Sequence, residues 1–306
     1  MNGLRADATG MKLAIKVDVD TYRGTRDGVP VLRGLFERFE VPATFLFSFG
    51  PDNTGKALRR IFRKGFLKKC LRSNVAGNYG IKTLLYGTLL KAPKISKLCS
   101  AQMKEVRAAG FECGIHSWDH FNWQERLPRM RPTEVDMEFM RARAEFEKIF
   151  GETAKCCGAP GWQITPDALE TEDKAGLLYA SDARGKTPFF PSMGGRSFKT
   201  LQIPTTLPTL DELLGIVKTD DVADIYMGDI SRSDFSVMTV HAELEGGAYA
   251  RLFGDFLSRA AAEGVEFASL EACARKVLSA PHSVPACEIR MAEFPGRSGL
   301  LAQQAI

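Results

Sequence analysis

Three short apolar runs in this chain each end in residues that can bind a metal ion or move a proton. The first run ends at Asp18 and Asp20. The second ends at His116, with His120 four residues later, and the third ends at His241. The carboxyl ends of parallel strands meet at one edge, where α/β enzymes assemble their sites. We therefore expect these side chains, distant in sequence, to meet at one rim of a parallel sheet or barrel.

The rest of the chain alternates strand and helix patterns, which is typical of repeated βα units. Strands are expected at 12–19, 41–49, 111–115, 154–159, 178–181, 200–203, 236–240 and 265–268. Helices are expected at 28–40, 55–72, 79–92, 95–109, 133–150, 209–217, 219–230, 246–263 and 269–279. Thr133 is expected to cap one helix, and Thr165-Pro166 to open another. The pattern predicts a somewhat irregular α/β barrel of about seven or eight βα units.

Composition sets the expected domain boundaries. Residues 1–10 resemble a flexible leader, and Met11 is an alternative start. Residues 11–280 are expected to form the barrel, with a basic helical insertion at 52–105. Residues 281–306 have no clear periodicity and are expected to form a C-terminal extension on or near the barrel.

Positive charge gathers in one part of the chain. Although the formal net charge of all 306 residues is only +4, there are thirteen basic and no acidic residues between Asp52 and Glu105. Such an asymmetry indicates a surface for an anionic partner. The densest part, here named the basic cluster, consists of Arg59, Arg60, Arg63, Lys64, Lys68, Lys69 and Arg72.

The insertion is more typical of a membrane surface than of a nucleic-acid site. Residues 81–90 carry one charge and are too short to span a bilayer, which favours embedding at the interface. Leu58, Ile61, Phe62 and Phe66 share a helical face, which Lys69 interrupts. A solvated basic face is the alternative. We expect no nucleic-acid partner, because no base-reading module is recognisable.

The cysteines and the N-terminus indicate a cytosolic protein. The seven cysteines are scattered without CxxC spacing, which favours a reducing compartment over a disulfide framework. The first apolar run is short and is broken by Lys12 and Lys16, so it does not resemble a signal peptide.

Asp18 and Asp20 lie on the same face of an extended segment because side chains alternate along a strand. Two such carboxylates can divide the work, one binding a metal ion and the other accepting a proton. A capping pair and a Mg²⁺ site are alternatives. His116 and His120 can face one ion if the loop after their strand is helical. Beside such an ion, His241 is best used as a general acid, although a buried structural histidine is the alternative.

Together these motifs resemble those of the NodB-type polysaccharide deacetylases, which are metal-dependent amidohydrolases on a distorted (β/α)₇ barrel. The resemblance implies that Asp18 is the catalytic base and that Asp20, His116 and His120 are the metal ligands. It implies that His241 is the catalytic acid, tuned by Asp182. It also implies a groove wall formed by Pro160, Gly161 and Trp162.

One position departs from the family pattern. The family usually has an arginine two residues before the proline of the third motif, where it orients the catalytic base, and this chain has Gly158 there. Arg23, Arg26 and Arg184 are the expected substitutes, and they are also expected to contact the substrate.

Further stretches resemble one branch of the family, the deformylases of phosphoundecaprenol-linked 4-deoxy-4-formamido-L-arabinose. They include residues 18–26, 50–53, 71–74, 203–204, 206–209 and 241–243. This resemblance implies an undecaprenyl-phosphate-linked formamido sugar as substrate. It implies a role in lipid A modification and polymyxin resistance, at the cytoplasmic face of the inner membrane with its anionic lipids.

Zinc is the expected ion, although manganese, cobalt, nickel and iron also suit two histidines and a carboxylate. Three alternative functions would each explain some of these sequence features. A deacetylase of other N-acylated sugars or polysaccharides would use the same site. A non-enzymatic membrane or polyanion-binding protein would need no metal. A non-haem iron oxygenase would leave the second aspartate and His241 unexplained.

Overall fold

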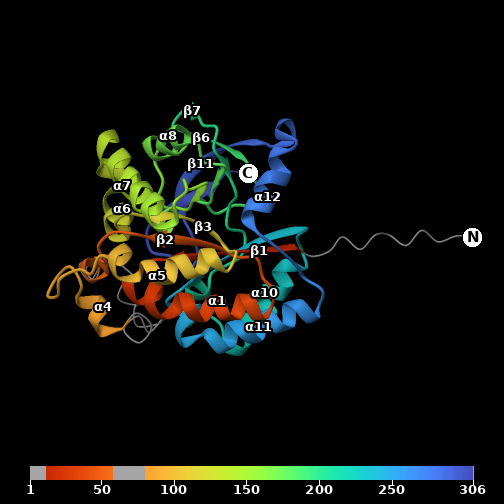
Figure 1. The fold of residues 1–306 in the computed structure, drawn as a ribbon. Helices are drawn as coiled ribbons and strands as arrows, with labels where there is room; N and C mark the ends of the chain where they lie inside the picture. Colours follow the sequence, from red (N-terminus) through yellow and green to blue (C-terminus); the bar gives the residue numbers. More distant parts are fainter. Residues whose placement is uncertain (1–11, 58–79, 306) are drawn as a thin grey trace, which may run out of the picture.

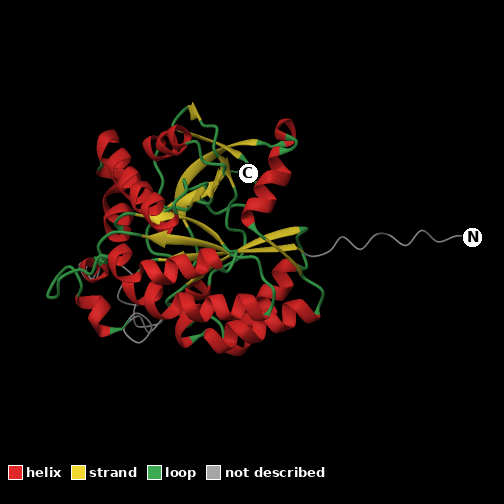
Figure 2. Ribbon diagram, viewed as in Figure 1, coloured by secondary structure: helices red, strands yellow, loops and turns green. Residues whose placement is uncertain are grey.

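The computed structural model describes residues 12–57 and 80–305. Parallel strands form a curled sheet at the centre of this part of the chain, and helices pack around it (Figures 1 and 2). The strand order is β10-β1-β2-β3-β4-β5-β8, with β9 pairing along β1. This is the expected distorted (β/α)₇ architecture.

All the expected strands are present. The curled sheet consists of β1 (Lys12–Val19), β2 (Thr44–Ser48), β3 (Glu112–Ser117), β4 (Cys156–Cys157), β5 (Tyr179–Ala180), β8 (Leu201–Gln202), β9 (Phe235–His241) and β10 (Glu266–Ala268). Three of them, β4, β5 and β8, have only two residues each and are shorter than expected. Beyond β8, the Thr206 backbone N–H donates to the Val237 carbonyl at 3.0 Å, which carries the pairing on to β9.

The helices follow the predicted order with local differences. They are α1 (Val29–Arg38), α4 (Ile81–Leu85), α5 (Ile95–Ala108), α6 (His120–Arg126), α7 (Pro132–Phe150), α8 (Pro166–Ala175), α9 (Leu210–Leu213), α10 (Val222–Ile230), α11 (Ala250–Ala262) and α12 (Leu270–Leu278). The helix expected over 79–92 is mostly wrong, because a turn with Gly87 at φ +75° follows α4. Thr133 is not a cap, since α7 already begins at Pro132.

A buried apolar core holds β1 in place. Phe36 of α1 packs edge-on against Phe45 of β2 and Phe253 of α11. Val17 and Val19 of β1 are fully buried in the same cluster. Because β1 is packed on both faces and paired along its length, the residues at its carboxyl end have a defined position.

A second sheet, which the tail forms together with residues 190–197, was not expected. It contains β6 (Phe190–Met193), β7 (Arg196–Ser197), β11 (Ala286–Glu293) and β12 (Leu300–Gln304) in the order β12-β11-β6-β7. Backbone bonds join β12 to Arg184, whose N–H donates to the Ala302 carbonyl at 2.9 Å and whose carbonyl accepts from the Gln304 N–H at 2.8 Å. The tail is therefore tied to the loop that follows β5.

The basic cluster lies outside the described residues, as does the segment 71–74. Among the described helices, none has both the length and the apolar character needed to cross a bilayer.

Candidate active site

The register of the curled sheet brings the carboxyl ends of β1 and β9 together. Asp18 of β1 and His241 of β9 are direct partners in the parallel ladder. Partner residues of adjacent parallel strands point to the same face, so both side chains lie on the same side of the sheet. Both are buried, with 4% of Asp18 and 8% of His241 exposed.

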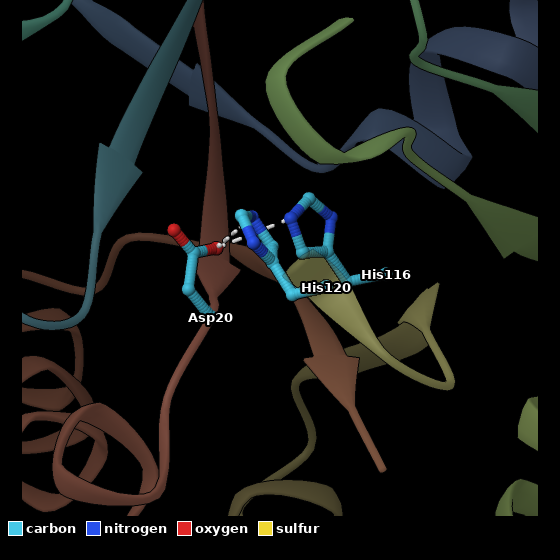
Figure 3. A group of neighbouring side chains, drawn as sticks. All are labelled: Asp20, His116 and His120. Atoms are coloured by element: carbon cyan, nitrogen blue, oxygen red, sulfur yellow. Dashed lines mark ion pairs between the residues drawn. The ribbon is translucent and has the colours of Figure 1, made fainter. Parts of the chain in front are cut away.

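Asp20 lies just beyond the end of β1 and faces two imidazoles (Figure 3). Its Oδ1 atom is 3.1 Å from Nε2 of His116 and 3.4 Å from Nε2 of His120. Ligands about 2.1 Å from one tetrahedral ion lie roughly 3.4 Å apart. The three ligand atoms therefore have the spacing and chemistry that a divalent metal ion requires.

The two histidines do not share a helical turn, as the i, i+4 spacing had suggested. His116 belongs to strand β3, whereas His120 is the first residue of α6. The Gly158 carbonyl lies 2.7 Å from Nδ1 of His116, which leaves Nε2 free to bind a metal. Asp119 caps α6 by accepting from the Asn122 N–H, and this cap fixes the start of the helix at His120.

Electrostatic interactions among these groups favour a metal site. Burial alone would raise the pKa of Asp20, but the neighbouring His120 and His116 lower it strongly. Burial alone would lower the pKa of His116, but Asp18 and Asp20 raise it. A cation held by Asp20 would compete for the same carboxylate and lower the proton affinity of both imidazoles.

Two buried glutamates after β9 support the site and were not assigned a role from the sequence. Oε1 of Glu243 accepts from the N–H of Thr21 at 2.8 Å and from its hydroxyl at 2.6 Å. A Cβ at Gly24 would lie 2.0 Å from the same oxygen, so a larger residue there would displace the Glu243 carboxylate from Thr21. Oε2 of Glu245 accepts from the His241 N–H at 2.8 Å. These contacts tie the loops after β1 and β9 together.

Glu245 is expected to make folding pH-dependent. Burial raises its pKa from 4.5 to about 7, although His241 partly opposes the shift. The folded protein therefore keeps a proton that the unfolded chain releases, so stability falls as pH rises from about 4.5 through 7. Glu245→Gln should remove this loss, which amounts to about 3 kcal/mol at pH 8. In denaturant unfolding of the metal-free proteins, Glu245→Gln should be more stable than the wild type at pH 8. At pH 5 the two proteins should have nearly the same free energy of unfolding. An equal difference at both pH values would contradict the shift.

The structure does not bring Asp182 to His241. Oδ2 of Asp182 accepts from Nε2 of Gln202 at 2.7 Å. Burial raises the pKa of Asp182, an effect opposed by Gln202 and Lys16. Among the described residues, Nδ1 of His241 has no hydrogen-bond partner. The role of Asp182 as a tuning acid therefore remains a prediction, without a direct contact to support it.

Residues 160–162, expected to form a groove wall, pack around Trp162. Pro160, Gly161 and Trp162 make one 3₁₀ turn, in which Gly161 has φ +57°. The Trp162 ring lies 5.2 Å from the guanidinium of Arg184 and 4.6 Å from that of Arg297. Pro160 and Trp162 are buried, so contact with a substrate remains a prediction for this motif.

The three arginines expected to replace the family arginine have other ion-pair partners. Arg26 pairs with Asp27 at 2.6 Å, and Arg23 lies 3.9 Å from the same carboxylate. Arg184 is buried and pairs with Glu212 at 3.4 Å. The ion-pair partner of Asp18 in the described structure is a lysine of its own strand.

Comparison with known proteins settles the family. The family model described as Polysaccharide deacetylase matches residues 18–180, more than half of the chain. The chain belongs to the polysaccharide deacetylase family. As a member of that family it is a hydrolase acting on amide bonds, as predicted, and the alternative of a non-enzymatic binding protein does not hold.

Two curated relatives of this polysaccharide deacetylase match it over almost the whole length of both chains. A probable 4-deoxy-4-formamido-L-arabinose-phosphoundecaprenol deformylase of Shewanella sediminis is 38% identical over 299 residues, covering 96% of this chain and 95% of the relative. A protein of the same description from Wigglesworthia glossinidia brevipalpis is 33% identical over 284 residues, covering 92% and 98%.

A solved structure supports the fold. The putative polysaccharide deacetylase from Mycobacterium smegmatis superposes with a TM-score of 0.65 at 15% identity, covering 95% of this chain and 98% of that one.

Proposed function

We propose that this protein is a divalent-metal-dependent deformylase of phosphoundecaprenol-linked 4-deoxy-4-formamido-L-arabinose. The products are formate and the lipid-linked 4-amino sugar, which serves lipid A modification and thereby polymyxin resistance. The observation that carries the reaction type is the grouping of Asp20, His116 and His120 beside the Asp18–His241 pair. The names of the two relatives, at 38% and 33% identity over most of the chain, support the substrate.

In this proposal the residues at the rim divide the chemistry. Asp20, His116 and His120 would hold one divalent ion, which supplies a polarising charge for the formyl oxygen and acidifies water. Asp18 takes the proton of the attacking water. His241 gives a proton to the amine nitrogen as the carbon–nitrogen bond breaks. Because Asp18 and His241 are ladder partners, the base and the acid border the same reacting group.

Formate release tests the proposal. The purified protein is given the formamido sugar lipid and, in parallel, its N-acetyl analogue and short N-acetylated oligosaccharides. We expect rapid formate release from the first substrate and slow acetate release from the others. Faster release of acetate from the oligosaccharides would instead identify a deacetylase of soluble sugars, the alternative that the family membership supports. An absence of release from all substrates would reject the proposal.

We also propose peripheral binding to an anionic membrane through the segment 81–91. At 72% and 82% exposed, Ile81 and Leu89 are the two most exposed large hydrophobic side chains among the described residues. Lys82 and Lys91 beside them are also exposed. Apolar side chains flanked by lysines suit the interface of an anionic bilayer.

This apolar segment lies next to the candidate active site. The rings of Tyr22 and Tyr86 meet edge-on with centroids 6.4 Å apart. Tyr22 follows Asp20 by two residues. A lipid-linked sugar therefore has a short route from the bilayer surface to the rim.

Leu89→Glu is expected to weaken binding to vesicles of anionic phospholipid. Removing one embedded leucine costs about 1.5–3 kcal/mol, or roughly 10- to 100-fold in partitioning. Vesicle co-sedimentation measures the loss. Ile216→Glu is the matched control, since Ile216 is 58% exposed and lies in the turn after α9. Equal binding of both variants and the wild type would contradict the membrane proposal.

A further inference from the structure

We infer that Lys16 positions the carboxylate of Asp18 for proton abstraction, supplying the cation that position 158 lacks. The inference rests on the proposed function, because it takes Asp18 to be the catalytic base. It gives a functional role to Lys16, a charged residue within a largely apolar strand.

Lys16 is a charged residue in the interior of the central strand. It lies in β1 two residues before Asp18 and therefore on the same face. Its exposure is 0%, and Nζ is 3.6 Å from Oδ1 of Asp18. Transferring an ammonium from water into the interior costs several kcal/mol unless a partner and hydrogen bonds compensate. A lysine buried in this way is consistent with selection for its charge.

The remaining contacts of Lys16 hold the ammonium in one place. Nζ donates to the carbonyl of Ser181 at 2.9 Å. The Trp162 ring lies 5.7 Å from the same atom. Oδ1 of Asp18 is buried and makes no hydrogen bond among the described residues, so the ion pair with Lys16 is the interaction that orients it.

Gly158 is complementary to Lys16. A Cβ built at Gly158 would lie 3.4 Å from Nζ of Lys16 and 2.5 Å from Cδ1 of Leu46. A longer side chain at this position would therefore enter the space that the ammonium and Leu46 occupy. The cation reaches the site from strand β1 instead of from the loop after β4, and glycine at 158 leaves room for it.

The same ammonium also acts on Asp182. Burial raises the pKa of Asp182, and both Gln202 and Lys16 oppose this rise. Lys16 thus interacts with Asp18 of β1 and with Asp182 in the loop after β5. One buried cation therefore links the proposed base to a second buried carboxylate.

Lys16→Gln and Lys16→Arg test the inference. Glutamine can still donate to the Ser181 carbonyl but has no charge, whereas arginine keeps the charge. We expect Lys16→Gln to lower kcat for formate release about 100-fold, as for a misplaced catalytic group. KM and the metal content should stay within about twofold, and Lys16→Arg should recover most of the loss. Lys12→Gln, which removes an exposed lysine on the same face of β1, should match the wild type.

A double-mutant cycle with Asp18→Asn separates positioning from a merely structural role. If Lys16 acts through Asp18, adding Lys16→Gln to Asp18→Asn should change kcat by less than about twofold. Multiplicative losses would overturn the inference, as would a wild-type kcat for Lys16→Gln. Full activity of Asp18→Asn would instead reject the proposed base and with it the proposed mechanism. If Lys16→Gln fails to fold, Lys16→Met takes its place in the same cycle.

Discussion

Replacing His116 by Ala is expected to remove the bound metal ion and to abolish turnover. His116 supplies one of three ligands, and its Nε2 lies 3.1 Å from the shared Oδ1 of Asp20. Losing even an outer-shell partner weakens metal binding by about 10- to 100-fold, so loss of a ligand should exceed this. Without several kcal/mol of transition-state stabilisation from the ion, kcat should fall by about 10³-fold or more. Metal titration and formate release measure the two effects.

His282→Ala is the matched control for this experiment. His282 lies in an exposed turn after α12 and contacts none of the rim residues. This variant should retain both the metal and full turnover. If the His116→Ala protein bound one ion with unchanged affinity and released formate at the wild-type rate, the assignment of the metal site would be wrong.

Replacing His241 by Ala should abolish most turnover while the metal stays bound. His241 pairs with Asp18 across the ladder and is not one of the three clustered ligand residues. A general acid typically contributes about 10²- to 10⁴-fold, and kcat should fall by that factor. The metal content, measured on the same sample, should equal that of the wild type.

The leaving group provides a sharper test of His241. An aniline leaves more easily than an alkylamine and needs less protonation. The loss caused by His241→Ala should therefore be smaller for an N-formyl aniline than for the sugar lipid. A loss of equal size for both substrates would show that His241 acts in some other way than as the acid.

The rim of the site was predictable because its residues follow a topological rule. Asp20, His116 and His241 each lie at or just beyond the carboxyl end of a strand. The carboxyl ends of parallel strands meet at one edge of the sheet, independently of the conformation of the loops. The same rule does not determine the angle at which a loop leaves its strand. The meeting of His116 and His120 was therefore expected, but the strand-and-helix geometry that produces it was not.

Other features have no signature in a single sequence. Lys16 interrupts an apolar run, and sequence patterns do not distinguish a buried ion pair from an exposed lysine. The Gly158 carbonyl orients His116 through the backbone, so the residue type carries no signal. Strand β11 is a different case, because it does alternate. Cys287, Ile289 and Met291 are more buried than the charged residues between them, so the expectation of a tail without periodicity was wrong at this strand.

Strand β12 makes the loop that follows β5 depend on residues 300–304, which come much later in the sequence. Gln304 accepts through its side-chain oxygen from the N–H of Lys186, and its own N–H donates to Arg184, two residues after Asp182. During translation these bonds cannot form until residue 304 has left the ribosome. The loop after β5 should therefore take its final form only after strand β12 has been synthesised.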